Sequence, residues 1–445
     1  MKLPHPLTML VACTVIAAAL THVLPAGQFD RRDDPAAGRK VVVAGTYHHV
    51  DAHPVGAFET LVAIPDGIID AASVIAFVFL VGGAFGVVDK TGALHDGIDW
   101  LVRRLGHRGI VAVPIVCIAF AAGGAFENMQ EEIIAIVPAL LMLTQRLGFD
   151  AVTAAEMSVG AAAVGSAFSP VNPFQVLIAQ KVAMIPQLSG GGFRVVFLAL
   201  ALLLWILGTM RHARRTRVEV VRVDTAHESR AFGGRGAAVL ALVLLTFAVF
   251  VYGVAALHWD FNQEAALFFA MGCAVGLIGG LGVTGTADAF VDGFRSMAYA
   301  ALLIGFARSI STVMEQGLII DTVVNGIAAT LAGLPVAVAA VGMMAAQAAI
   351  HVPVPSVSGQ AVLTLPVFAP LADLLHFSRQ VAVLAFQYGA GMSELVTPTN
   401  GALMAILAAA GVRYDEWLRA TGRMIAVVMV TGAGAVVLAV VVGLR

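Results

Sequence analysis

Long apolar segments recur along the whole chain and constrain its fold more than any other feature. Each approaches the roughly 20 helical residues that cross the hydrocarbon core of a bilayer. Of the 445 residues, 59% are hydrophobic and only 12% are charged, which makes the chain far more apolar than a soluble domain. The segments are uniformly apolar and do not alternate as the strands of a membrane barrel do. The sequence therefore predicts an all-α polytopic membrane protein.

Arginines are concentrated between the apolar segments of the two halves. Seven lie in one stretch: Arg211, Arg214, Arg215, Arg217, Arg222, Arg230 and Arg235. The positive-inside rule places this stretch in the cytoplasm, so no nucleic-acid partner is needed to explain it. The three cysteines lie in apolar segments, without the spacing of a disulfide framework or a zinc site.

A short pattern occurs twice, and each copy interrupts an apolar segment. Ser169-Pro170-Val171-Asn172-Pro173 returns 228 positions later as Thr397-Pro398-Thr399-Asn400-Gly401, and Pro138 matches Pro366 at the same offset. Polar, helix-breaking backbone at membrane depth is tolerated only where it is buried in protein or lines a cavity. Paired interruptions of this kind are the best sequence-level pointer to the binding site of a transporter. We therefore expect two broken helices that form one site.

The residues after each proline can begin a new half-helix. Asn172 suits an N-cap before Pro173, and Asn400 suits the same position before Gly401. The N-terminus of a half-helix attracts carboxylates, whereas the carbonyls freed before the break can hold Na⁺. The alternative is a pair of simple proline kinks.

A polar cluster lies one segment upstream of each break. The first contains Glu127, Asn128, Glu131 and Glu132, and the second runs from 351 to 360. We predict that both are tips of re-entrant hairpins, although ordinary loops outside the membrane are the alternative. Just before the second break, Glu394 is expected to take up a proton or to pair with a cationic group of a substrate.

Several motifs together resemble the YfcC branch of the C4-dicarboxylate anaerobic carrier (DcuC-like) family. The resemblance is carried by Gly82 to Gly92, the Glu131-Glu132 pair, Val171 to Phe174, Ser358 to Ala361, and Gln380 to Gly389. The sequence departs from the family pattern at Phe126-Glu127-Asn128, Phe168-Ser169-Pro170 and Ala390.

The resemblance implies a multi-pass carrier of the ion transporter superfamily in the bacterial inner membrane. It implies two inverted repeats, each with a re-entrant hairpin and a broken (unwound) transmembrane helix, a scaffold that forms a homodimer, and elevator-type movement. We expect these parts in chain order: an N-terminal transmembrane helix and extracytoplasmic loop (1–57), a first repeat (58–210), the cytoplasmic basic loop (211–236), linking transmembrane helices (237–284) and a second repeat (285–445).

These expectations define a secondary active transporter of a small carboxylate-bearing metabolite, either a C4-dicarboxylate or an amino acid. Coupling to Na⁺ or H⁺, or exchange, would drive it, with no other cofactor and no resident metal. Because acidic residues outnumber basic ones around the site, a basic amino-acid antiporter is the alternative, and a passive channel is a further one. An enzyme is not predicted, since no nucleophile with a base and no H-E-x-x-H pair occurs. The expected substrate- or ion-binding residues are Glu127, Asn128, Glu131, Glu132, Ser169, Asn172, Ser356, Ser358, Gln360, Glu394, Thr397, Thr399 and Asn400.

Overall fold

The computed structural model describes residues 4–34, 39–94, 96–97, 106–218, 234–257 and 259–444. Within these ranges, seven helical stretches are long and apolar enough to cross a membrane. They are α3 (Ala72–Lys90), Gly109–Phe126, which includes most of α5 (Ala112–Glu127), α10 (Gly191–Arg215), α12 (Phe261–Ile278), α13 (Gly282–Gln316), α16 (Val357–Leu374) and α19 (Tyr414–Val441). The chain is thus a multi-pass membrane protein.

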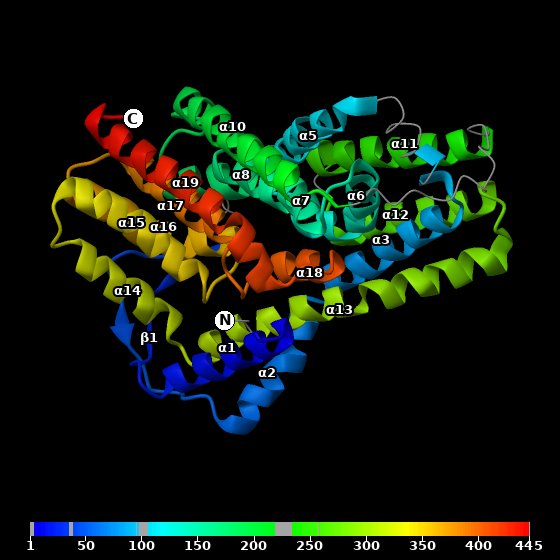
Figure 1. Ribbon diagram of the computed structural model, residues 1–445. Helices are drawn as coiled ribbons and strands as arrows, with labels where there is room; N and C mark the ends of the chain where they lie inside the picture. The colour runs from blue at the N-terminus through cyan, green and yellow to red at the C-terminus, as the bar shows by residue number, and fades with distance from the viewer. Residues whose placement is uncertain are drawn as a thin grey trace.

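The remaining helices complete the bundle (Figure 1). They are α1 (Pro6–Thr21), α2 (Ala57–Asp70), α6 (Glu131–Leu147), α7 (Ala151–Ala155), η2 (Glu156–Gly160), α8 (Ala161–Ala167), η3 (Pro173–Leu177), α9 (Ile178–Val182), α11 (Gly234–Leu257), α14 (Ile320–Leu331), α15 (Val336–His351), α17 (Arg379–Ser393) and α18 (Gly401–Ala409), with the 3₁₀ turn η1 (Gly106–Val111).

The prediction of a predominantly helical membrane protein is confirmed, but the N-terminal segment also contains four short strands that the sequence did not predict. β1 (Gly27–Gln28) pairs antiparallel with β4 (His48–His49), and β2 (Arg31–Asp34) pairs antiparallel with β3 (Arg39–Val42). The run of valines in β3 favours extended structure, and Val41 and Val42 are buried. Composition alone identified this segment as polar, but it gave no sign of the strands.

The second half repeats the element order of the first. In the first half, α5 and α6, joined by a short turn and called here the first hairpin, are followed by the broken helix α7–η2–α8 and η3–α9, and then by α10. In the second half, α15 and α16 form the hairpin, α17 and α18 form the broken helix, and α19 follows. Pro138 lies inside α6 and Pro366 inside α16, as the offset of 228 requires.

Small residues allow two helices of the first half to pack backbone against backbone. A Cβ at Gly124 of α5 would lie 2.0 Å from the carbonyl oxygen of Ala162, and one at Gly165 of α8 would lie 2.0 Å from that of Ala121. Such close approach is typical of helix pairs in membranes. It fixes α5 against the helix that leads to the first break.

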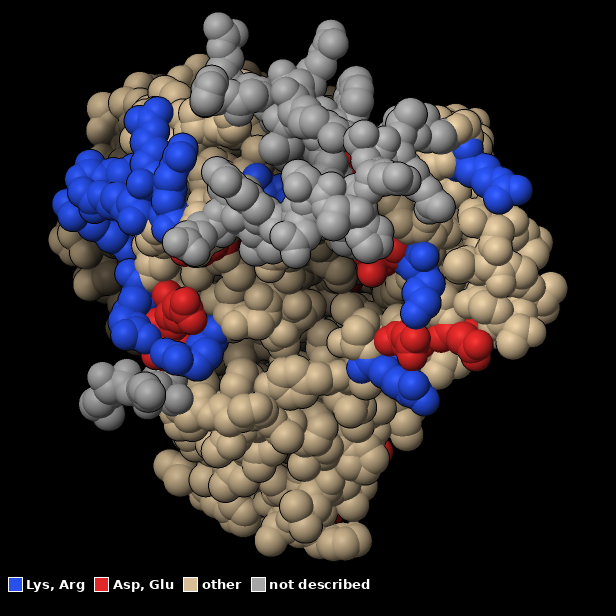
Figure 2. Space-filling model, turned by 45° about the vertical axis from the view of Figure 1, so that its right-hand side comes forward, with Lys and Arg blue, Asp and Glu red and all other residues tan. Residues whose placement is uncertain are grey.

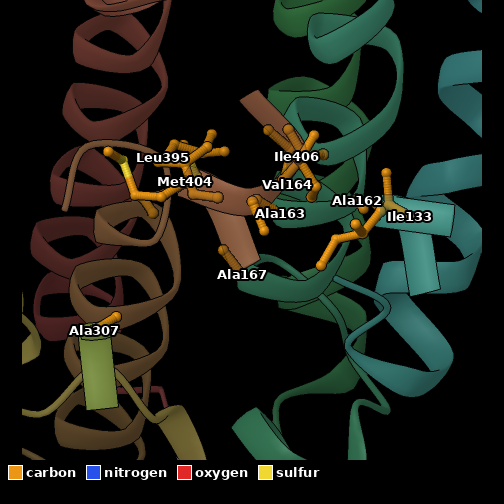
Figure 3. Close-up of a cluster of buried hydrophobic side chains, with 14 of the residues drawn as sticks. Ile133, Ala162, Ala163, Val164, Ala167, Ala307, Leu395, Met404 and Ile406 are labelled. Carbon is orange, nitrogen blue, oxygen red and sulfur yellow. The ribbon is translucent and has the colours of Figure 1, made fainter. Parts of the chain in front are cut away.

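Apolar side chains from both halves share one core. Figure 3 shows Ala163 and Val164 of α8 between Ile133 of α6 on one side and Leu395 and Met404 of the second half on the other. All five side chains are buried. The two broken helices are therefore packed together and do not belong to separate domains.

Helix α13 is the longest element, with 35 residues, or about 52 Å at 1.5 Å per residue. It packs against α2, α3 and α18. Two exposed ion pairs lie along it: Arg295 with Asp292 (3.3 Å) and Arg308 with Asp70 of α2 (3.6 Å). Figure 2 shows that charged side chains on one face gather above a broad area without charge, as expected for a surface in contact with lipid.

Candidate functional site

The first break, between α8 and η3, is organised by the hydroxyl of Ser169. Its Oγ donates a hydrogen bond to the carbonyl of Ala125, at the end of α5 (2.7 Å). The same oxygen accepts hydrogen bonds from the backbone N–H groups of Val171 (3.0 Å) and Asn172 (2.8 Å). Ser169 therefore joins the break to the first hairpin.

Asn172 has the N-cap role that the sequence predicted. Its Oδ1 accepts hydrogen bonds from the N–H groups of Phe174 (2.9 Å) and Gln175 (2.8 Å). Its Nδ2 donates to the carbonyl of Gly124 in α5 (2.8 Å). Two of the donors at this helix start are thus satisfied by the protein's own side chain.

Gln175 extends this network to the hairpin tip, a role that sequence reasoning missed. Its Nε2 donates to Oδ1 of Asn128 (2.8 Å) and to the hydroxyl of Ser166 (2.6 Å). Ser166 also donates to Asn128. The signal was present, since a polar residue three positions after a predicted N-cap lies in the first turn of the new helix.

The second break, between α17 and α18, has an N-cap at the matching position. Oδ1 of Asn400 accepts a hydrogen bond from the N–H of Leu403 (3.1 Å), which confirms the second predicted cap. Its Nδ2 makes only long contacts, each 3.3 Å, with Oε1 of Gln130 and the carbonyl of Glu394. Thr399 donates to the carbonyl of Val352 (2.5 Å) and so joins this break to the second hairpin.

The tip of the second hairpin is held by its own side chains. Ser356 caps α16, and its Oγ accepts a hydrogen bond from the N–H of Gly359 (3.3 Å). Nε2 of Gln360 donates to the carbonyl and to Oε1 of Gln347, each at 2.7 Å, and Oε1 of Gln360 is 3.0 Å from Nδ1 of His351.

Two further predicted residues lie in the second half. Ser358 lies in the first turn of α16, and Thr397 is buried in the second break.

Three of the predicted carboxylates gather near the tip of the first hairpin. Glu394 is 5% exposed, and its Oε2 has no hydrogen-bond partner among the described residues. It interacts electrostatically with Glu131, and Glu132 interacts with both Glu131 and Glu264 of α12. Glu264 was not predicted. The side chain of Glu127, the fourth predicted carboxylate, lies outside the part of the chain that the structure describes.

Direct contacts join the two breaks across the halves. Nε2 of Gln387 in α17 donates to the carbonyl of Ser169 (2.7 Å). The rings of Phe168 and Tyr388 stack with centroids 4.4 Å apart and an interplanar angle of 21°. Fully buried Arg194 of α10 donates to Oε1 of Gln387 (2.8 Å). The predicted meeting of the two copies of the motif is therefore observed, although none of these three contacts was predicted.

A cavity of about 510 Å³ opens beside the second hairpin. Ser356 and Gly359 line it together with side chains of both charge signs: Arg31, Lys40, Arg308, Glu315 and Asp321. Arg31 pairs with Asp321 (3.0 Å). A cavity of this volume falls within the range that small-molecule sites occupy. Among the described residues, no group of three or more histidines, cysteines and carboxylates could hold a metal.

The profile of one transporter family, described as C4-dicarboxylate anaerobic carrier, matches residues 3–441. A protein of Escherichia coli (strain K12), provisionally described as a basic amino acid antiporter, YfcC, is 33% identical over 491 residues, covering 99% of this chain and 97% of that one. An uncharacterized protein of Haemophilus influenzae is 28% identical over 486 residues, covering 97% of this chain and 95% of that one.

Two solved structures are similar to the fold at low identity. The Alcanivorax borkumensis YdaH transporter is 16% identical with a TM-score of 0.46, covering 99% of both chains. Neisseria gonorrhoeae MtrF is 15% identical with a TM-score of 0.42, covering 99% of this chain and 96% of that one.

Proposed function

The chain belongs to the C4-dicarboxylate anaerobic carrier family, whose members are transporters and not enzymes, and we propose that it is a secondary active transporter of a small carboxylate-bearing metabolite. A Na⁺ or H⁺ gradient, or exchange against a second solute, drives the transport. The observation that carries the proposal is the contact between two capped breaks from opposite halves of the chain, made by Gln387 with Ser169 and by Phe168 with Tyr388.

The carboxylates at the first hairpin favour an amino acid with a cationic side chain. Glu394 has a buried oxygen without a partner, and Glu131 and Glu132 lie near it. A buried carboxylate is stabilised by an opposite charge within a few ångströms. The second break, where Nδ2 of Asn400 makes only long contacts, is then left for the α-carboxylate of the substrate. The name of the Escherichia coli relative, a basic amino acid antiporter, agrees with this choice.

A C4-dicarboxylate is the second candidate, supported by the cavity beside Ser356. Arg31, Lys40 and Arg308 line it, and paired carboxylates are commonly bound by such cations. However, Arg31 and Arg308 already pair with Asp321 and Asp70. A dicarboxylate would have to compete with these two residues, and for that reason we place it second.

The proposal includes the remaining family features. The two copies of the hairpin and broken helix are inverted repeats. The transport domain, which holds the site, moves as an elevator against a scaffold domain, and the scaffold forms a homodimer in the bacterial inner membrane. The recurrence of the element order supports the repeats. The arginine-rich stretch that begins at the end of α10 supports a cytoplasmic position for residues 211–236.

Uptake into proteoliposomes tests the function. The purified protein is reconstituted, and radiolabelled L-arginine and succinate are offered with an outward gradient of unlabelled L-arginine, with a Na⁺ gradient, or with a pH gradient. We expect saturable uptake of L-arginine that depends on one of these gradients. Uptake that neither saturates nor responds to any gradient would indicate a channel, and saturable uptake of succinate alone would establish the second candidate.

A further inference from the structure

One buried carboxylate, Glu156, lies apart from the candidate site. It is 0% exposed, and neither of its carboxylate oxygens has a hydrogen-bond partner among the described residues. Burial of an unpaired carboxylate is costly in free energy, so ionisable residues inside membrane proteins generally mark ion or proton pathways. Glu156 therefore requires an explanation that the transport site does not supply.

The backbone around Glu156 is unusual. Glu156 begins η2, a π-helical turn between α7 and α8, and turns of this kind are rare and frequent at functional sites. The indole Nε1 of Trp205 in α10 donates to the carbonyl of Glu156 (2.8 Å). A Cβ at Gly160 would lie 2.1 Å from the Trp205 ring, so this glycine makes room for the indole. The turn is thus stabilised from outside by a specific contact.

A cavity of about 320 Å³ between α10 and α19 reaches Glu156. Four basic residues line the same cavity: Arg211, His212, Arg215 and Arg423. It lies at the arginine-rich end of α10, which the positive-inside rule places towards the cytoplasm. Glu156 consequently has a route to the cytoplasmic side that does not pass through the contact between the two breaks.

The charges around Glu156 come from each neighbouring element. Asp150, just before α7, pairs with His212 of α10 (Oδ2 to Nε2, 3.1 Å), and both interact electrostatically with Glu156. The buried thiol of Cys117 in α5 also interacts electrostatically with the Glu156 carboxylate. Helix α8 has no ionisable residue. Together with Arg211 and Arg215 of α10 and Arg423 of α19, these groups make the surroundings predominantly cationic.

This balance of charge points to the smallest cation. A Na⁺ or divalent ion would meet four basic side chains and a single carboxylate, whereas such ions are normally held by several oxygen ligands. A proton needs no coordination shell and leaves a neutral acid. We propose that Glu156 is a proton-binding site that is loaded and unloaded through this cavity from the cytoplasmic side.

The proton step is simple. A hydronium ion in the cavity gives its proton to one carboxylate oxygen of Glu156, forming an O–H bond and leaving a water molecule. Release breaks that bond and transfers the proton to water, which becomes hydronium again. Once ionised, the carboxylate is stabilised by His212, with which it interacts electrostatically, so both states are accessible. The role as a coupling site rests on the proposed transport function, because Glu156 belongs to the same helix, α7–η2–α8, that ends at the first break.

Infrared difference spectroscopy of the full-length protein in lipid tests the binding of the proton without any substrate. The spectrum in acidic buffer minus the spectrum in alkaline buffer should contain a carboxylic-acid band. This band should be lost in Glu156→Gln and retained in Glu156→Asp. The matched control is Asp415→Asn, which removes a buried carboxylate that is fully paired with Arg413 and Arg419. A wild-type band that survives in Glu156→Gln overturns the proposal.

Two further measurements keep the test decisive. If Glu156→Gln does not fold, Arg423→Gln replaces it: loss of a cation from the cavity should move the midpoint of the band to higher pH, and an unmoved midpoint overturns the proposal. The pH dependence of L-arginine counterflow should flatten in Glu156→Gln. A failure of L-arginine uptake in the wild type counts against the transport function, while the infrared band still decides the proton site.

Discussion

The two broken helices carry the same hydroxyl, proline, any residue, asparagine pattern, yet their polar groups are used differently. At the first break, Asn172 makes three hydrogen bonds of 2.9 Å or less, and Ser169 makes three of 3.0 Å or less. At the second, Asn400 makes a single cap and two long contacts, and Glu394 has an oxygen without a partner among the described residues.

This difference indicates a division of labour between the two repeats. A denser network of hydrogen bonds rigidifies the chain and leaves fewer groups for a ligand, although Oε1 of Gln175 at the first break also has no partner among the described residues. Unpaired buried groups gain most when a ligand arrives. We infer that the first break mainly anchors the structure and that the second mainly binds. The predictions below test this division of labour, and they are ordered from the largest expected effect to the smallest.

The strongest test of the anchor is Gly124→Ala. The new Cβ would lie 2.0 Å from a backbone oxygen of α8, and since backbone cannot yield as a side chain does, the free energy of unfolding should fall by about 3 kcal/mol. Melting of the solubilised protein followed by size-exclusion chromatography measures this loss. The control is Gly359→Ala in the second hairpin, where the nearest atom is the Ser356 hydroxyl at 3.1 Å, and it should melt close to the wild type.

The two asparagines provide the next comparison. Asn172→Ala removes the two hydrogen bonds of one N-cap and the hydrogen bond to the carbonyl of Gly124, so the free energy of unfolding should fall by about 2 kcal/mol. Asn400→Ala removes a single cap hydrogen bond, and the expected loss is about 1 kcal/mol. Uptake of L-arginine per folded molecule should fall more in Asn400→Ala than in Asn172→Ala. Equal losses of stability and of uptake in the two variants would contradict the division of labour.

Glu394→Gln tests the binding region alone. Loss of the carboxylate should lower the affinity for L-arginine about tenfold, or about 1.4 kcal/mol, because a charge-assisted contact is replaced by a neutral one. The melting temperature should not fall, since the change removes an unpaired buried charge. Ligand-induced thermal shifts give the affinity, and Glu416→Gln, an exposed carboxylate nearby, is the matched control. Unchanged affinity would exclude Glu394 from the site.

The smallest effect is expected for Ser356→Ala. Its cap to Gly359 is long (3.3 Å), and the loss of free energy of unfolding should be about 0.5 kcal/mol. The same melting assay measures it. A loss as large as that of Asn172→Ala would show that the second hairpin is anchored as firmly as the first.

The sequence predicted the broken helices because their cause is local. A proline followed by a residue that can cap the next helix stops one helix and starts another, and Asn172 and Asn400 do so in the structure. The turn at the first polar cluster has a local cause too, since α5 ends at Glu127 and α6 begins at Glu131, while the re-entrant path of the hairpins stays a prediction. Helix-breaking chemistry can be recognised in a short window.

The contacts that join the halves could not be predicted from such windows. Gln387 reaches Ser169 across 218 positions, and Arg194 reaches Gln387 across 193. Gln387 does not reveal its partner, because a buried glutamine and a lipid-facing one look alike in sequence. Arg194 stands out as a charge in an apolar segment, but its own segment gives no sign of which element it contacts. The strands at the N-terminus were missed for a related reason: Asp321, which accepts a hydrogen bond from the N–H of Phe29 (2.9 Å), lies far along the chain.

Helix α13 also has a consequence for the membrane around the protein. Arg308 lines the cavity beside the second hairpin, so the C-terminal part of this helix faces a cavity of the protein and not only lipid. With 35 residues, or about 52 Å, the helix is much longer than the hydrocarbon core of about 30 Å. It must therefore tilt strongly within the bilayer or extend beyond the core, and bilayer thickness becomes a variable that acts on its orientation.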